Sequence, residues 1–291
     1  MALSEESKAL LQAQVKLWNQ TFSFMKSVAL AVALDLRIAD AIRHHGGAAT
    51  IPQILAGIGI SPCKLAGLRR LMRVLTVAGT FTVQPPETSS GGHDEPIYKL
   101  TTVSRLLTTS DDGDETSASC LSPMLSHVLN PFHDSELSMG LAAWFRHDEE
   151  PGKCPYARMH GATVWEMCGS SDAVNASINN AMAADSRFLM RVVLEEYGET
   201  IFRGVDSLVD VAGGVGGSSA TIAAAFPSLK LTVLDLPHVV AKAPSVSNVQ
   251  FVAGDMFESI PPGNAVFLKV IKLMPLAFYM DSYWSPLLLI F

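Results

Sequence analysis

A glycine-rich segment in the last third of the sequence has the residue types of a ligand-binding turn. Residues 208–219 read LVDVAGGVGGSS, and they lie between an apolar run that predicts a strand and a run that predicts a helix. Glycine at such a turn lets a ligand approach the backbone, and the N–H groups at the start of the helix remain free to bind it. As a dinucleotide fingerprint the pattern is incomplete, because Ser219 stands where the third glycine belongs. The segment therefore predicts either a nucleotide or nucleoside site or a tight loop without a ligand.

Two acidic residues follow the next two predicted strands. Asp235 comes directly after the first of these strands and can accept hydrogen bonds from both hydroxyls of a ribose. Asp255 follows the next one, where its carboxylate could hold an adenine amino group while Met256 packs on the ring. NAD would also need donors for a pyrophosphate, for which the nearest basic candidates are Lys242 and Lys269. This set of residues favours an adenosine that carries a sulfonium amino acid over NAD.

Four short apolar runs must form the sheet that positions these residues. Their β-branched composition is typical of strands that are buried on both faces. The runs are 207–211, 231–234, 249–252 and 265–270. A helical pattern over 218–226 separates the first two, and a strand, a helix and a strand in succession predict parallel pairing with right-handed crossovers.

The composition narrows the class of protein. The chain has 291 residues, a formal net charge of −7, 48% hydrophobic residues and 17% charged residues, which predict folded domains with a substantial core. The acidic balance gives no global attraction to nucleic-acid phosphates. The four cysteines form no CxxC pair and the first ten residues do not read as a secretory leader. We therefore expect a cytoplasmic protein with reduced thiols, no metal site and no membrane segment.

The first 110 residues are predicted to form a domain of their own. Apolar residues at alternating spacings of four and three from Leu11 to Leu36 predict one amphipathic helix of at least about seven turns. This apolar stripe either packs against its own domain or is shared between subunits. Shorter helices follow, one of them capped by Thr50, and β-like runs at 80–83 and 97–101 predict a hairpin. Three helices and a hairpin indicate a winged helix.

A winged helix can bind DNA or mediate dimerisation. The third helix of the motif carries four lysine or arginine residues between positions 64 and 73, as a recognition helix does. The loop that would form the wing contains Glu87, Asp94 and Glu95 and has no lysine or arginine. The sequence therefore favours dimerisation or scaffolding over nucleic-acid binding.

Four motifs in order resemble one enzyme family. LVDVAGGVGG, LDLPHVV, FVAGDMFESIP and AVFLKVI are similar to motifs of the plant S-adenosylmethionine (SAM)-dependent O-methyltransferases of the caffeic acid and isoflavone type. PYARMHGATVWEMCG and NNAMAADSRF resemble that family's substrate region. The resemblance implies an α/β fold in which a helical, winged-helix-like dimerisation domain (1–110) precedes a helical connector and substrate region (111–200). A Rossmann-like (class I) methyltransferase domain would occupy 201–291.

The resemblance also implies a set of cofactor-binding residues for SAM. They are Gly213, Gly214, Gly216, Asp235, Asp255, Met256, Lys269 and Ser186. Within this set, Asp235 would hold the ribose, and Asp255 and Met256 would hold the adenine. Lys269 would lie alongside the cofactor and Ser186 near its amino acid end.

The implied reaction is methyl transfer from SAM to a hydroxyl of a small phenolic acceptor. Met182 matches a substrate-contacting methionine of the family, although this residue could equally belong to the core. The partners implied are the phenolic substrate and either a second copy of the chain or a full-length relative. Neither a nucleic acid nor a membrane is implied.

Two positions depart from the family pattern. Ala212 replaces the first glycine of the family's usual three. The family's general base is a histidine four residues after the lysine, and this chain has Leu273 there, with all eight histidines at or before His238. We therefore assign no catalytic residue and expect little activity from this chain.

The resemblance also ends abruptly after residues 270–271. This predicts that the methyltransferase domain is truncated at its C-terminus and carries an aberrant tail from about residue 272. The alternative to a weakly active enzyme is a non-catalytic pseudoenzyme that dimerises or binds the cofactor.

Overall fold

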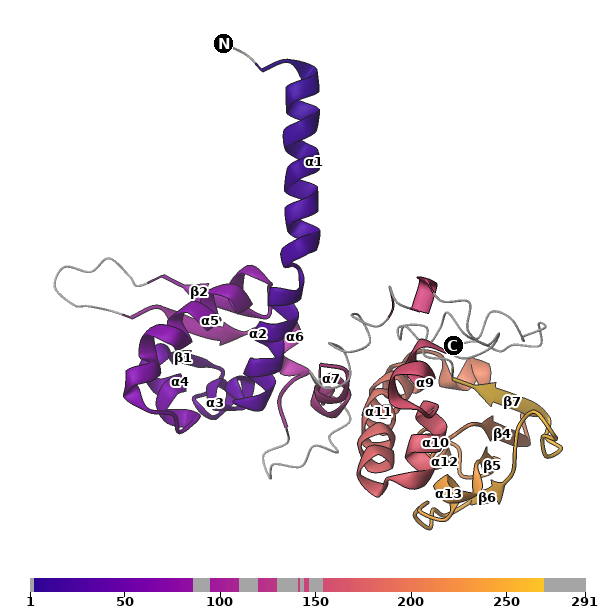
Figure 1. Cartoon of the computed structure of the whole chain (residues 1–291). Coiled ribbons are helices and arrows are strands. Elements are labelled where there is room, and N and C mark those ends of the chain that lie inside the picture. Colours follow the sequence, from indigo (N-terminus) through magenta and orange to yellow (C-terminus); the bar gives the residue numbers. More distant parts are fainter. Residues whose placement is uncertain are drawn as a thin grey trace. The chain divides into compact units, whose positions relative to one another are not determined.

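A computed structural model describes residues 3–85, 95–109, 120–129, 141, 144–146 and 154–269. The chain forms two compact units, Met1–Glu115 and Thr116–Phe291, which are described separately (Figure 1). Most of the predicted wing loop, with Glu87 and Asp94, lies outside the described residues, as do Leu273 and the predicted tail from about residue 272.

The predicted long N-terminal helix is wrong in one respect, because it is two helices. Helix α1 (Glu5–Phe22) ends before Ser23, and α2 (Phe24–Asp35) begins after it. At this junction the backbone N–H and the hydroxyl of Ser23 both donate to the backbone carbonyl of Gln20, at 3.3 and 2.8 Å, which is three residues back instead of the four of an α-helix. The two helices differ in environment, since α1 buries none of its residues whereas α2 buries Ala29 and Ala33.

The rest of the first unit combines short helices with a small antiparallel sheet. Its elements are α3 (Ile38–His44), β1 (Ala48–Thr50), α4 (Ile51–Gly57), a 3₁₀ turn (Pro62–Lys64), α5 (Leu65–Val77), β2 (Phe81–Gln84), β3 (Ile97–Leu100) and α6 (Thr102–Arg105). The predicted hairpin is confirmed as the β2–β3 pair, and the unpredicted β1 joins it in the order β1-β3-β2. Thr50 caps α4 as predicted, in a reciprocal capping box with Gln53.

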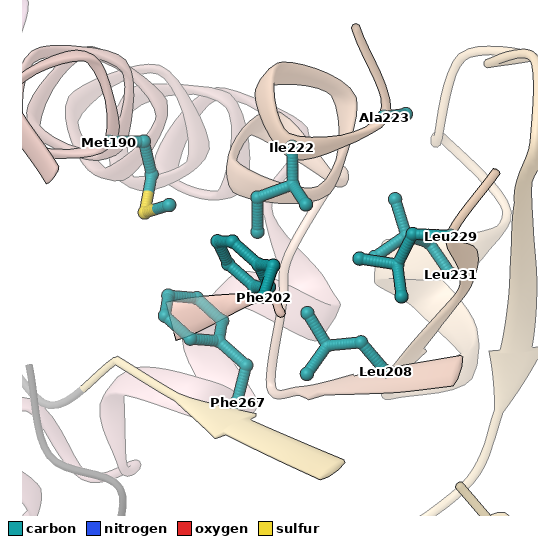
Figure 2. Packing of buried hydrophobic residues seen from close by; sticks show 8 residues of the cluster. All are labelled: Met190, Phe202, Leu208, Ile222, Ala223, Leu229, Leu231 and Phe267. Carbon is teal, nitrogen blue, oxygen red and sulfur yellow. The ribbon is translucent and has the colours of Figure 1, made fainter. Parts of the chain in front are cut away.

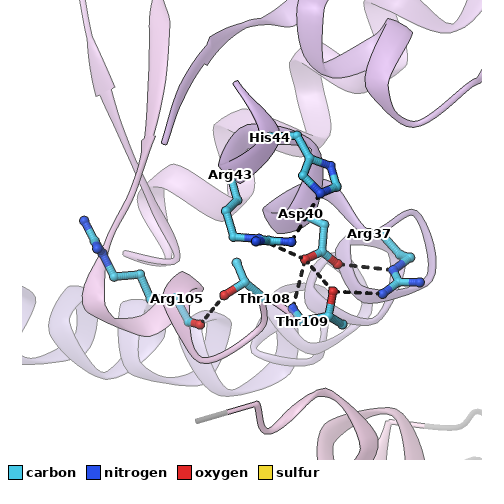
Figure 3. Close-up of polar contacts among 7 residues, drawn as sticks. All are labelled: Arg37, Asp40, Arg43, His44, Arg105, Thr108 and Thr109. Atoms are coloured by element: carbon cyan, nitrogen blue, oxygen red, sulfur yellow. Dashed lines mark hydrogen bonds and ion pairs between the residues drawn. The ribbon is translucent and has the colours of Figure 1, made fainter. Parts of the chain in front are cut away.

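A buried carboxylate joins the end of this unit to α3 (Figure 3). The Asp40 carboxylate accepts hydrogen bonds from the backbone N–H of Thr109 at 2.9 Å and from its hydroxyl at 3.1 Å. Arg37 donates to the same carboxylate at 3.2 Å, and Arg43 forms an ion pair with it at 3.7 Å. Because Asp40 is buried, these partners replace the water that its charge would otherwise require.

The second unit contains a parallel sheet that is preceded by helices. Its elements are α7 (Ser122–Val128), α9 (Pro155–His160), α10 (Val164–Ser170), α11 (Asp172–Ile201), β4 (Ser207–Val211), α12 (Gly217–Ala225), β5 (Lys230–Asp235), α13 (Pro237–Val240), β6 (Val249–Ala253) and β7 (Ala265–Leu268). The strand order is β6-β5-β4-β7 and all three pairings are parallel, as the sequence predicts.

The core of this unit fills the space between the sheet and two of its helices (Figure 2). Met190 of α11 and Ile222 of α12 point toward strand residues Leu208, Leu231 and Phe267. On the opposite face, a smaller cluster is formed by Val209, Val211 and Leu234. Side chains alternate between the faces of a strand, so β4 contributes to both clusters. The sheet is therefore packed on both faces.

Two kinds of feature are absent from the part of the chain that the structure describes. None of its helices is both long enough and apolar enough to cross a membrane. No group of three or more histidine, cysteine, aspartate or glutamate side chains there could hold a metal ion.

Candidate functional site

The order of the strands has a topological switch point between β4 and β7. From β4 the chain passes to β5 and then β6 on one side, and it returns to β7 on the other side of β4. Ligands of open α/β sheets bind at such a switch point, outside the carboxyl ends of the strands. Asp235 is the last residue of β5, Asp255 follows β6 closely and Lys269 comes directly after β7. The structure thus brings these predicted residues to the same edge.

The turn after β4 needs glycine for packing and for backbone conformation. A Cβ atom at Gly213 would lie 2.6 Å from Cγ of Asp210, and one at Gly216 would lie 2.7 Å from Cζ of Phe251. Gly214 and Gly216 also have positive φ angles, of 61° and 79°. Ala212 has a φ of 55°, so its departure from the family's glycine leaves a strained residue in the turn.

The Asp235 carboxylate ties this turn to the neighbouring strand. Its Oδ2 accepts a hydrogen bond of 2.7 Å from the backbone N–H of Gly214, and its Oδ1 accepts one of 2.7 Å from the N–H of Leu236. A carboxylate offers about four lone-pair sites, so each oxygen can accept a further hydrogen bond. The residue predicted to hold a ribose is therefore already fixed in orientation and still has acceptor capacity.

The two residues predicted for the adenine have local contacts of their own. Oδ1 of Asp255 accepts a hydrogen bond of 2.9 Å from the backbone N–H of Phe257. This bond closes a tight turn after β6. Met256 is half-buried and packs against the cluster that contains Val211 and Leu234. These contacts hold Met256 at the sheet edge.

Asp210 is a buried acid that the sequence reasoning did not single out. It lies in β4 on the same face as Leu208, and its Oδ2 accepts a hydrogen bond of 2.7 Å from the hydroxyl of Ser219. Burial raises the pKa of Asp210 to about 7; the Ser219 hydrogen bond lowers it, the negative charge of Asp235 raises it and the positive charge of Lys269 lowers it. Its position inside an otherwise apolar run was the only sequence signal available.

The side chain of Lys269 contacts α11. Its ammonium donates a hydrogen bond of 3.1 Å to the hydroxyl of Ser186 and forms an ion pair with Asp185. The structure thus joins two predicted residues that are 83 positions apart in the sequence. The sequence analysis did not predict a role for Asp185, because nothing but its position next to Ser186 indicated one. Met182 lies one turn earlier on α11 and is half-buried, an environment that also suits a core residue.

Comparisons with known proteins agree with this arrangement. A family model of the O-methyltransferase domain matches residues 139–273, and one of the O-methyltransferase dimerisation domain matches residues 18–110. The chain is 66% identical to a 5-pentadecatrienyl resorcinol O-methyltransferase of Sorghum bicolor, over 92% of this chain and 73% of that protein. It is 47% identical to acetylserotonin O-methyltransferase 2 of Oryza sativa subsp. japonica, over 89% and 68% of the two chains.

A solved structure shares the fold. Human N-acetylserotonin methyltransferase, crystallised in complex with SAM, superposes with a TM-score of 0.67 at 20% identity. The match covers 92% of this chain and 72% of the human one. The predicted fold class, a helical N-terminal dimerisation domain followed by an α/β methyltransferase domain, is confirmed.

The pKa of Asp210 predicts a pH-dependent stability. Because the folded state holds this proton more tightly than the unfolded state, the free energy of unfolding falls as the pH rises from 3.8 to about 7. We expect Asp210→Asn, which mimics the neutral acid and can still accept from Ser219, to remove this loss. At pH 8 the variant should be more stable than the wild type by at most about 4 kcal/mol, with a much smaller difference at pH 4.

The measurement is urea unfolding from pH 4 to pH 8, with hydrogen exchange of β4 and α12 amides to localise the effect. Asp206→Asn is the matched control, since this exposed residue precedes β4 at the opposite edge of the sheet. Parallel stability curves for the wild type and Asp210→Asn would contradict the buried, protonated acid.

Proposed function

This chain belongs to the O-methyltransferase family, and we propose that it binds SAM at the carboxyl edge of its parallel sheet and transfers the methyl group to a phenolic hydroxyl. The observation that carries this proposal is the convergence of the glycine turn, Asp235, Lys269 and Ser186 at the switch point. The similarity to a resorcinol O-methyltransferase supports a small phenol as the acceptor.

The residues at the carboxyl ends of the strands leave space for SAM and offer the polar groups that it needs. A Cβ added at Gly214 would meet nothing within 4 Å, so the backbone of the turn borders open space. Asp235 would accept hydrogen bonds from the ribose hydroxyls with its remaining lone pairs, and Asp255 and Met256 would hold the adenine. Ser186 and Lys269 would meet the amino acid end. When bound, SAM supplies a methyl group that is activated by a positively charged sulfur.

We also propose that this chain transfers the methyl group slowly. A phenol has a pKa of about 10, so a base must help to remove its proton near neutral pH. The sequence motif after Lys269 has Leu273 where the family has its histidine. A hydrocarbon side chain at this position cannot accept the proton.

A second copy of the chain is the partner that we propose for the first unit. Helix α1 has no buried residue, and the four apolar side chains that form its stripe are between 50% and 57% exposed. They are Leu11, Val15, Trp18 and Phe22. An exposed stripe of this kind needs an apolar partner, and the match to a dimerisation domain supports a copy of the same chain.

The first prediction tests the cofactor site. We expect the chain to bind S-adenosylhomocysteine in isothermal titration calorimetry and Asp235→Asn to weaken that binding by about tenfold, because one charged acceptor is lost. Asp206→Asn, at the opposite edge of the sheet, should bind like the wild type. Failure of the folded wild-type chain to bind at millimolar ligand would contradict the proposed cofactor site.

The second prediction tests the chemistry. With saturating SAM and a resorcinol as the acceptor, the chain should transfer methyl groups roughly 10²–10⁴-fold more slowly than the Sorghum bicolor relative, which is the range that general base catalysis contributes. Product formation is measured by mass spectrometry. A rate comparable to that of the relative would show that position 273 does not limit the reaction. No detectable product together with tight binding would favour a non-catalytic role.

The third prediction tests the partner. Sedimentation velocity should find a dimer of the wild-type chain, and Trp18→Asp should shift it toward the monomer because a charge would be buried in the apolar contact. Gln20→Asp is the control, since it introduces the same charge about 200° around α1 from Trp18. Equal dimer fractions for the two variants would exclude the α1 stripe from the interface.

A further inference from the structure

Helix α11 carries two aspartates that pair with lysines of the sheet region, and the two pairs differ in burial. Asp172, at the start of the helix, pairs with Lys242, and the side chains are 94% and 45% exposed. Asp185 pairs with Lys269, and these side chains are only 30% and 12% exposed. The exposed pair contributes little to stability, whereas the second pair lies where water screens charge less.

The Lys269 ammonium is held from one side by α11. It has three N–H donors, of which one reaches the Ser186 hydroxyl and another the Asp185 carboxylate. The contacts of the described residues use two of these three donors, and we assign the third to a ligand. Among the residues that the structure describes, Asp185 is the carboxylate that pairs with this nearly buried ammonium, so an uncharged side chain at position 185 would remove that ion pair.

The charges here complement those of an α-amino acid. A free amino acid group carries one ammonium and one carboxylate, and this end of the site presents the Lys269 ammonium beside the carboxylate of Asp185. The other end of the edge, with Asp235 and Asp255, has acceptors that suit a nucleoside.

We propose that Asp185 is a positioning residue that fixes the Lys269 ammonium beside Ser186 and thereby sets the affinity of the site for the amino acid part of the cofactor. This inference rests on the proposed function, since it assumes that the cofactor site is at this edge. Asp185 acts through Lys269 and does not itself touch the nucleoside.

Two ligands that differ only in the amino acid part test the inference. S-adenosylhomocysteine carries this part, and 5′-methylthioadenosine lacks it but keeps the nucleoside and a thioether. We expect Asp185→Asn to weaken binding of the first by about tenfold and to leave binding of the second unchanged in calorimetry. A purely structural role would weaken both ligands together and lower the melting temperature.

Asp172→Asn is the matched control, because it removes the other aspartate–lysine pair of the same helix. It should leave both affinities unchanged. Asp185→Glu, which keeps the charge, should restore the affinity ratio to within about threefold of the wild-type value. If Asp185→Asn does not fold, Asp185→Ser removes the charge without introducing an amide, and the same loss is expected.

The outcomes separate the two proposals. An unchanged ratio in the uncharged variants, with a wild-type chain that binds both ligands, overturns the role of Asp185 and leaves the cofactor site standing. A folded wild-type chain that binds neither ligand overturns both proposals. An equal loss for the two ligands assigns Asp185 to the fold alone and also overturns the inference.

Discussion

The contact between the Asp210 carboxyl group and the backbone of Gly213 is the constraint on which the candidate site depends. The carboxyl group fills the space where a side chain at position 213 would lie, and the hydroxyl of Ser219 on α12 holds it there. A strand, its turn and the following helix are thereby locked together around one buried polar group. Because this group is deeply buried, its neutral form is favoured, and the turn avoids the cost of an unpaired buried charge.

The rest of the site is assembled around this turn by neighbours that are distant in the sequence. Asp235 of β5 holds the turn through the N–H of Gly214. The end of β7 is tied to α11 through Lys269, and α11 approaches the start of α12 closely, since a Cβ at Gly217 would lie 3.7 Å from Cα of Ala183. The hydrophobic core between the sheet and the helices α11 and α12 fixes the position of both helices on the strands. Packing thus determines where the charged groups of the edge meet.

The parallel sheet was predicted correctly from the local pattern of apolar residues. The single N-terminal helix was predicted wrongly because the hydrogen bonds at Ser23 do not show in that pattern. The strand pattern predicts a parallel sheet, which is observed, and parallel strands bring all their carboxyl ends to one side. The apolar periodicity from Leu11 to Leu36 predicts a single helix, yet α1 and α2 are separate because the backbone N–H of Ser23 bonds to Gln20, three residues back instead of four. Periodicity records which face is apolar and does not record a hydrogen bond that interrupts the helix.

The sequence by itself determined the order of the strands in the second unit, the glycine turn and the acids that end β5 and follow β6, because each of these follows from neighbouring residues. It left the roles of Asp210 and Asp185 open. Asp185 meets Lys269 across 84 positions, and Asp210 meets the backbone of its own turn only after the turn has folded back over the strand. Only the tertiary structure decided these contacts, because the packing of α11 and α12 on the sheet sets which polar groups are buried together.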